Sequence, residues 1–282
     1  MSTSAVVLAD AFTELSARER AHAVLDRGTF RELLGPFDRL ESPHLAPQGI
    51  VPQSDDGAVV ARGTISGERA VVVAVDGRFQ GGGIGEVNGA KLAAGLELAA
   101  QDWENGAPIR PVLLLETGGI RLQEANLGLL AIADLHAAIV RLRQYTPVVG
   151  VVAGMVGCFG GMGIAAGLCT DLVMIRQGRL GLNGPEVIEQ EAGVEELDSR
   201  DRAMVWSVIG GEQRTAARLA DLLVDDDTAA VRDAVRLAFE PGRAGPPRSA
   251  RVDEALALLD SLDPADRLTP QDLRDKTKGQ TK

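Results

Sequence analysis

The stretch CFGGMGIAAGLC, residues 158–169, decides the fold of this chain of 282 residues. A hydrophobic run, PVVGVVAGMVG (residues 147–157), precedes it and is typical of a buried strand. Two glycines then lead directly into a helical pattern, and no serine, lysine or histidine stands at the turn. Glycine lets a backbone approach a ligand closely, and the first N–H groups of a helix have no partner inside it. The turn therefore predicts a site that binds negative charge through its backbone.

The same order of strand, glycine-rich turn and helix occurs at two earlier places. VVVAVDG (residues 71–77) leads to the glycines of residues 81–85, and PVLLLETGG (residues 111–119) leads to a long helical pattern. Units of this kind build a mostly parallel sheet with its working loops at the strand ends, so we predict an α/β fold. Three such turns are more than strand-to-helix packing usually needs, which favours an anion or oxyanion site.

Composition limits the classes of function. The formal charge is −11 and the pI is about 4.8, so we expect neither a nucleic-acid partner nor a membrane partner. The two cysteines, Cys158 and Cys169, cannot make a four-ligand zinc site, and no metal is expected. The sequence shows no signal-peptide pattern and no uninterrupted apolar run of about 18 residues. We therefore expect a cytoplasmic protein.

Segments before and after the repeated units have patterns of their own. Near the N-terminus, Ser16 with Glu19 and Thr29 with Glu32 have the spacing of capping boxes, which predicts two short helices. Runs of β-branched residues on either side of residues 66–67 predict a hairpin.

We divide the chain into three predicted parts. Residues 1–50 form an N-terminal helical attachment, residues 51–240 form the central domain, and residues 241–282 form a linker, a helix and a polar tail. The tail, from residue 267 onward, is expected to be a solvated end.

Motifs for nucleotide binding or nucleophilic catalysis are incomplete. There is no Walker phosphate loop and no G-x-S-x-G elbow. GMGIAA (residues 161–166) matches a dinucleotide fingerprint only loosely, since the next strand does not end on an acidic ribose ligand. Cys158 with His136 would make a thiol hydrolase, but a small buried residue before the turn is the simpler interpretation.

Three stretches resemble a known family. ETGGIRLQEANLGLLAIADLHAAI (residues 116–139) closely resembles the SGGARMQE segment of the carboxyltransferase subunits of acyl-CoA carboxylases, and FQGGGIGEVNGAK (residues 79–91) looks like their GGSMGSVVG turn. Residues 158–190 are similar to the family's stretch from its paired glycines to GFAGPRVIEQT. The resemblance covers about residues 57–225. It implies the crotonase-like fold, a superhelix of ββα units. With the segments already described, we predict this fold with N-terminal helices and a C-terminal helical tail.

Departures from this family narrow the choice within it. No cysteine-rich zinc ribbon precedes Cys158, and the chain is too short for a second crotonase-like half. Residues 14–57 and LGLNGPEVIEQEAG (residues 180–193) look most like the β subunits of biotin-independent malonate decarboxylases. The resemblance implies a decarboxylase that acts with a partner subunit and converts a malonyl thioester to an acetyl thioester and carbon dioxide.

The family likeness also implies the site residues. An enolate stabilised by backbone N–H donors needs no side-chain nucleophile, and the donors map by position to Gly119, Ile120, Gly160 and Gly161. The residues that would line the thioester arm, or pair with its charge, are Gly81, Gly82, Gly83, Lys91 and Arg121. Glu124 and Glu186 are acids near these loops, and neither is assigned as the proton donor.

The chain itself is expected to bind no cofactor. An acyl-carrier subunit would supply the thioester arm, a phosphopantetheine or CoA-like prosthetic group. The other expected partners are a γ-type crotonase-like subunit and an acyl-transferase subunit. The helix LGLLAIADLHAAIV (residues 127–140) is apolar around much of its circumference, which also predicts a partner.

Three other functions stay open at this stage. The chain can be a free-standing crotonase-type acyl-CoA hydratase or hydrolase, which would need its own acid or base and no partner. It can be the carboxyltransferase subunit of an acyl-CoA carboxylase. It can also be a non-catalytic scaffold subunit.

Overall fold

Seven strands form one sheet within the residues that this computed structural model describes, which are 11–49, 51, 57–124, 126–243, 245–263, 265–266 and 268–278. The strands lie side by side in the order in which they occur along the chain. They are β1 (Arg31–Leu33), β2 (Ala58–Ile65), β3 (Glu68–Val75), β4 (Arg110–Leu115), β5 (Val149–Val152), β6 (Asp171–Ile175) and β7 (Leu222–Val224). Each unit of the chain therefore adds to the sheet beside the unit before it.

The strand directions change once along the sheet. β1, β2 and β3 are antiparallel, and every pair from β3 to β7 is parallel. The turn between β2 and β3 has positive φ at Ser66 (54°) and Gly67 (79°), as a two-residue type I′ hairpin requires. The predicted hairpin and the predicted mostly parallel sheet are both confirmed.

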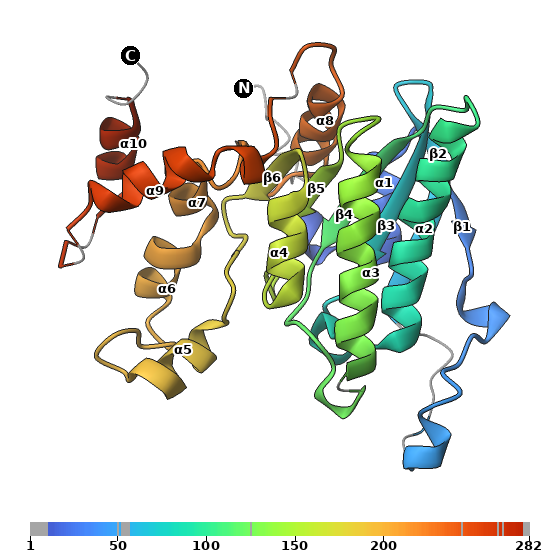
Figure 1. Cartoon of the computed structure of the whole chain (residues 1–282), viewed down its shortest axis with the longest axis horizontal. Helices are drawn as coiled ribbons and strands as arrows, with labels where there is room; N and C mark the ends of the chain where they lie inside the picture. The colour runs from blue at the N-terminus through green and yellow to red at the C-terminus, as the bar shows by residue number, and fades with distance from the viewer. Residues whose placement is uncertain are drawn as a thin grey trace, which may run out of the picture.

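Helices cover both faces of the sheet. Figure 1 shows α2, α3 and α4 on one face and α1 and α8 on the other, while α5, α6, α7, α9 and α10 gather beyond the β6 side. The helices are α1 (Ala17–Val24), α2 (Glu86–Glu104), α3 (Asn126–Leu142), α4 (Gly161–Leu168), α5 (Pro185–Ala192), α6 (Arg202–Ile209), α7 (Gly211–Ala216), α8 (Thr228–Ala238), α9 (Val252–Asp260) and α10 (Pro270–Lys278).

Strand side chains alternate between two hydrophobic cores. In β3, Val71 and Val73 belong to the core that contains Leu96 of α2, whereas Val72 belongs to the core that contains Val24 of α1. Successive strand residues point to opposite faces of a sheet. A strand covered on both faces must therefore be apolar at nearly every position, which explains the continuous hydrophobic runs in the sequence.

The N-terminal segment is part helix and part strand. α1 begins at the predicted capping box, where the side chain of Ser16 accepts the Glu19 N–H and the carboxylate of Glu19 accepts the Ser16 N–H. The second predicted helix is wrong, because residues 31–33 form β1 along the edge of β2. The carboxylate of Glu32 pairs with Arg18 at 3.0 Å instead of capping a helix. Pairing with a strand edge satisfies backbone groups on both strands and outweighs a weak local helix signal.

The C-terminal segment contains α9 and α10. Leu273 of α10 is buried, and the Nη2 atom of Arg218 donates to the carbonyl oxygen of Thr277 at 2.8 Å. The predicted tail therefore contains a helix that is anchored at Leu273 and Thr277, while its residues 271, 272 and 274–276 are exposed, as expected of a solvated segment. Residues 279–282 lie outside the described part. Within the described ranges, no helix combines the length and the apolar character that crossing a membrane would require.

Candidate active site

Backbone hydrogen bonds join the turns that follow β3, β4 and β5. The N–H of Ile84 donates to the carbonyl of Gly119 at 2.8 Å, and the N–H of Arg121 donates to the carbonyl of Ile84 at 2.9 Å. On the other side, the N–H of Thr117 donates to the carbonyl of Gly157 at 2.7 Å. These bonds form a short second ladder beyond the ends of the main strands, which fixes the glycine turns relative to one another.

Gly119 and Gly160 lie against each other across two of these turns. Their φ values are 117° and 62°, in the region that favours glycine. A Cβ atom added to Gly160 would lie 3.3 Å from the Cα atom of Gly119. Because Ile120 and Gly161 come next in the chain, the structure brings the four predicted catalytic positions together.

The four positions differ in whether their N–H groups are already used. The N–H of Gly119 donates to the Oγ1 atom of Thr117 at 3.1 Å, and the N–H of Gly160 donates to the carbonyl of Leu182 at 2.7 Å. The N–H groups of Ile120 and Gly161 have no acceptor among the described residues. Gly161 is also the first residue of α4, where the helix itself supplies no acceptor. Of the four N–H groups, those of Ile120 and Gly161 are therefore the two that remain available to a bound ligand.

Cys158 and His136 do not form a catalytic pair. The Nε2 atom of His136 lies 2.7 Å from the carbonyl oxygen of Gly161. Cys158 is fully buried, and this burial raises the pKa of its thiol far above the ordinary value. The interpretation of Cys158 as a small buried residue agrees with this placement.

The turn at residues 81–83 lies next to the turn that carries Gly119. The N–H of Gly118 donates to the carbonyl of Gly81 at 2.9 Å. Gly82 and Gly83 are buried, and a Cβ added to Gly82 would lie 2.1 Å from the backbone carbonyl oxygen of Glu116. Gly81 is exposed, and a Cβ added there would meet no atom within 4 Å. The turn therefore packs closely on one side and is open on the other.

The two predicted cations have partners within the chain. Lys91 is buried in α2, and its Nζ atom donates to the carbonyl of Ala58 at 3.1 Å. Arg121 is buried, its Nη1 atom lies 3.2 Å from the Oε1 atom of Glu124, and its guanidinium lies over the Phe79 ring. Both side chains therefore contact other residues of this chain, where they stabilise the glycine turns.

The two unassigned acids lie at helix starts. The Oε2 atom of Glu124 accepts the N–H of Glu86, the first residue of α2, at 2.7 Å. Glu186 is exposed in the first turn of α5. A carboxylate at a helix N-terminus is stabilised by the unpaired N–H groups there, so both placements have a structural reason.

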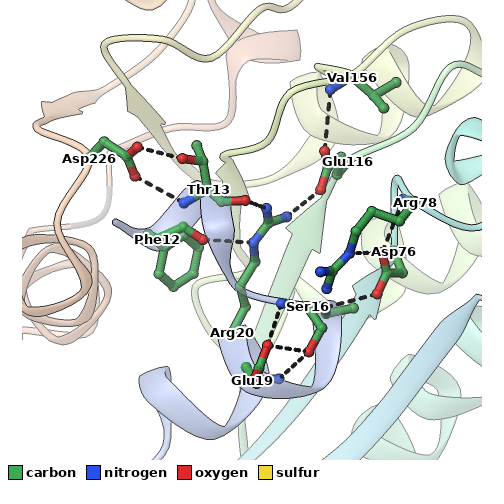
Figure 2. Close-up of polar contacts among 11 residues, drawn as sticks. Phe12, Thr13, Ser16, Glu19, Arg20, Asp76, Arg78, Glu116, Val156 and Asp226 are labelled. Atoms are coloured by element: carbon green, nitrogen blue, oxygen red, sulfur yellow. Dashed lines mark hydrogen bonds and ion pairs between the residues drawn. The ribbon is translucent and has the colours of Figure 1, made fainter. Parts of the chain in front are cut away.

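A buried ion pair that the sequence did not reveal lies beneath the turns. Figure 2 shows Arg20 of α1 pointing at Glu116, the residue after β4, with Val156 on the far side of the carboxylate. Arg20 and Glu116 are 3% and 5% exposed. The available signals were a charged residue on the apolar side of a helix and an acid between a buried strand and two glycines.

Apolar side chains are exposed around the turns. Leu122, Met155 and Leu182 are 84%, 67% and 64% exposed. Leu122 is two residues after Ile120, and Met155 directly precedes Val156. The carbonyl of Leu182 is the acceptor for the Gly160 N–H. Among the described residues, no three His, Cys, Asp or Glu side chains lie close enough together to hold a metal ion.

Comparison with known proteins gives consistent matches. The carboxyl transferase domain family matches residues 12–281. The malonyl-S-ACP:biotin-protein carboxyltransferase of Malonomonas rubra is 42% identical over 232 residues, which are 79% of this chain and 73% of that protein.

Solved structures give similar results. A chain of a Pseudomonas malonate decarboxylase hetero-tetramer in complex with malonate has 56% identity and a TM-score of 0.89, covering 96% of this chain and 98% of that chain. A chain of a Pseudomonas malonate decarboxylase hetero-dimer has 51% identity and a TM-score of 0.77, covering 92% of this chain and all (100%) of that chain.

These matches agree with the sequential parallel sheet and with the glycine turns that follow its strands. The α/β fold is therefore the crotonase-like one that the sequence predicted. The chain belongs to the carboxyl transferase domain family, among its malonate decarboxylase members.

Proposed function

We propose that this chain is the β subunit of a biotin-independent malonate decarboxylase and converts a malonyl thioester to an acetyl thioester and carbon dioxide. The observation that carries the proposal is the pair of N–H groups at Ile120 and Gly161, which lie on adjoining turns and have no acceptor among the described residues. The identity of 56% to a chain of the Pseudomonas enzyme supports the same conclusion.

The chemistry needs stabilisation of an oxyanion more than it needs a nucleophile. When the bond between Cα and the carboxylate breaks, carbon dioxide leaves. The electron pair of that bond moves through Cα onto the thioester carbonyl oxygen. The enolate then takes one proton at Cα and becomes the acetyl thioester. N–H groups directed at that oxygen lower the barrier, and removing one such donor typically lowers kcat by about 10²- to 10³-fold.

The open side of the turn at residues 81–83 fits the thioester arm. Gly81 is exposed with free space above it, and backbone packing leaves no room for a side chain on Gly82. A phosphopantetheine or CoA-like arm from an acyl-carrier subunit passes over this turn toward Gly119. Lys91 and Arg121 are turned toward acceptors in the chain, so their contact with the arm stays a prediction.

A second subunit completes the site. The related Pseudomonas structures are a hetero-tetramer and a hetero-dimer. Leu122, Met155 and Leu182 are exposed apolar side chains beside the proposed donors, and a partner that covers them also excludes water from the oxyanion. We assign this position to a γ-type crotonase-like subunit, with acyl-carrier and acyl-transferase subunits delivering the malonyl group. The assembly works in the cytoplasm, where the two cysteines stay reduced.

Carboxyl transfer to a biotin protein is the second candidate. It is favoured by the name of the Malonomonas rubra relative, a malonyl-S-ACP:biotin-protein carboxyltransferase. Both reactions form the same enolate, so the oxyanion hole serves either one. They differ in the fate of the carboxyl group, which is released as carbon dioxide in one and bound to biotin in the other.

The test is an assay of the chain alone and with co-expressed partner subunits on a malonyl thioester of the acyl carrier. We expect carbon dioxide and acetyl thioester from the complex without any biotin protein, and no turnover by the chain alone. Release that depends on an added biotin protein would establish the second candidate. Turnover by the isolated chain would support a free-standing enzyme. If substitutions at Gly160 do not change the turnover of the complex, the chain is a non-catalytic scaffold subunit.

A further inference from the structure

The carboxyl group of Glu116 fills the space where β3, β4 and β5 end. Its side chain is 7% exposed. A Cβ added to Gly77, after β3, would lie 2.4 Å from the carboxyl carbon, and one added to Gly154, after β5, would lie 2.2 Å from it. Both glycines therefore leave room for this one side chain, which lies directly beneath the turns of the proposed oxyanion hole.

Each oxygen of this carboxylate has its own partner (Figure 2). Oε1 accepts the N–H of Val156 at 3.2 Å, and Oε2 accepts from the Nη1 atom of Arg20. Val156 precedes Gly157, whose carbonyl accepts the N–H of Thr117, the residue after Glu116. The carboxylate therefore ties the turn before α4 to the turn before α3, and these turns carry the two proposed donors.

Arg20 is itself held in one position. Its Nε atom donates to the carbonyl of Phe12 at 2.9 Å, and its Nη2 atom donates to the carbonyl of Thr13 at 2.6 Å. A guanidinium is a rigid planar set of donors, so three bonds in different directions fix it. Its positive charge also offsets the buried carboxylate, which alone would oppose a developing oxyanion nearby.

We propose that Glu116 and Arg20 are positioning residues for the oxyanion hole formed by Ile120 and Gly161. Glu116 sets the separation of the two turns, and Arg20 holds and neutralises Glu116. The effect of these residues on kcat rests on the proposed function, because it presupposes the decarboxylation reaction. The structural role of Glu116, that its carboxylate orders both turns, is independent of which reaction the site performs.

The variants Glu116→Gln and Glu116→Asp test the proposal in the complex with partner subunits. The first removes the charge at nearly constant shape, and the second keeps the charge but shortens the reach by one methylene. Both should lower kcat at least about tenfold while KM changes by less than about twofold. A misplaced N–H donor weakens the hydrogen bond to the oxyanion, which forms in the transition state and not in the bound substrate. Arg20→Lys keeps the charge and loses the planar donors, so its kcat should lie between those of Glu116→Gln and the wild type.

Asp26→Asn is the matched control. Asp26 follows α1, pairs with Arg236 at 3.2 Å, and accepts from Thr64 and Gly67 at the hairpin end of the sheet, away from the glycine turns. This variant should lower the melting temperature and leave kcat within about twofold of the wild type. A loss of kcat in Asp26→Asn equal to that in Glu116→Gln would mean that Glu116 acts only through overall stability.

Amide hydrogen exchange separates the two proposals. Exchange at the N–H groups of Val156 and Thr117, which donate to Glu116 and to the Gly157 carbonyl, should be faster in Glu116→Gln than in the wild type, and unchanged in Asp26→Asn. If the wild-type complex decarboxylates and the Glu116 variants match it in kcat and in exchange, the positioning role is wrong. If the wild-type complex is inactive, the proposed function fails, and the exchange result still decides whether Glu116 orders the turns.

Discussion

The Nε2 atom of His136 donates a hydrogen bond of 2.7 Å to the carbonyl oxygen of Gly161. A carbonyl oxygen can only accept, so Nε2 carries a proton whatever the charge of the ring. The bond joins α3 to the first residue of α4, and that residue also provides one of the two proposed oxyanion donors. His136 is therefore well placed to fix the direction of the Gly161 backbone.

Replacing His136 with phenylalanine should lower kcat about tenfold, because the first turn of α4 loses the bond that orients it. Loss of this hydrogen bond should also lower the free energy of unfolding by about 0.5–1.5 kcal/mol. Steady-state decarboxylation by the complex and urea unfolding of the subunit measure the two effects. His22→Phe is the control, because His22 is exposed on α1. Unchanged kcat in His136→Phe would contradict the orienting role.

Replacing Gly160 with valine should lower turnover at least tenfold, because losing one oxyanion donor completely typically costs about 10²- to 10³-fold. The added Cβ would press on the Cα atom of Gly119 at 3.3 Å, and φ is 62° at this position. The matched control is Gly106→Val, where φ is 74° and a Cβ would meet nothing within 4 Å. Both variants carry backbone strain, so a loss of turnover specific to Gly160→Val isolates the site. Full activity in Gly160→Val would remove the proposed hole.

Replacing Cys158 with alanine should leave kcat within about twofold of the wild type, since only a small buried side chain is lost. The native thiol should also resist alkylation near pH 8, because burial keeps it protonated. Mass spectrometry of the alkylated subunit, folded and in urea, measures this protection. Near-complete loss of activity with an intact fold would revive the thiol hydrolase.

Alkaline pH should destabilise the subunit partly through Cys169. Burial raises the pKa of this thiol to about 12 from an ordinary value of 9.0. The unfolded chain therefore releases the proton first as pH rises, so the stabilisation is complete below about pH 9 and decreases towards about pH 12. Urea unfolding across this window should show a shallower loss of stability in Cys169→Ala than in the wild type. The cavity that alanine leaves lowers stability equally at every pH, so the comparison uses the slope of the unfolding free energy against pH. Equal slopes in the two proteins would contradict the contribution of Cys169.

The sequence predicted the parts of the fold that local rules determine. Apolar runs that lead into glycines identified β3, β4 and β5 with the helices that follow them, and residues 66–67 identified the hairpin. The helix predicted for residues 29–35 was wrong, because pairing of residues 31–33 with β2 outweighed the capping signal. That pairing depends on the edge of β2, which a local window of sequence does not contain.

The clustering of the four proposed site residues was predictable from the sequence, but the state of their N–H groups was not. Residues 119, 120, 160 and 161 do come together, but the sequence could not tell which N–H groups would already be bonded. The Leu182 carbonyl takes one of them from another loop. Arg20 and Glu116 are 96 residues apart, and the sequence signal at each residue does not identify the other as its partner. Only the folded chain places them together.

The sequential strand order also bears on when the site is completed during synthesis. A sheet that grows by neighbouring units can assemble from its N-terminal side as the chain emerges from the ribosome. The segment that holds Arg20 is an exception, because the backbone N–H of Thr13 bonds to Asp226 at 3.0 Å, 213 residues later. That contact forms only after all seven strands of the described sheet have been synthesised. Residues 12 and 13, whose carbonyls hold Arg20, are therefore among the last to be fixed in place, and the glycine turns gain their full support only then.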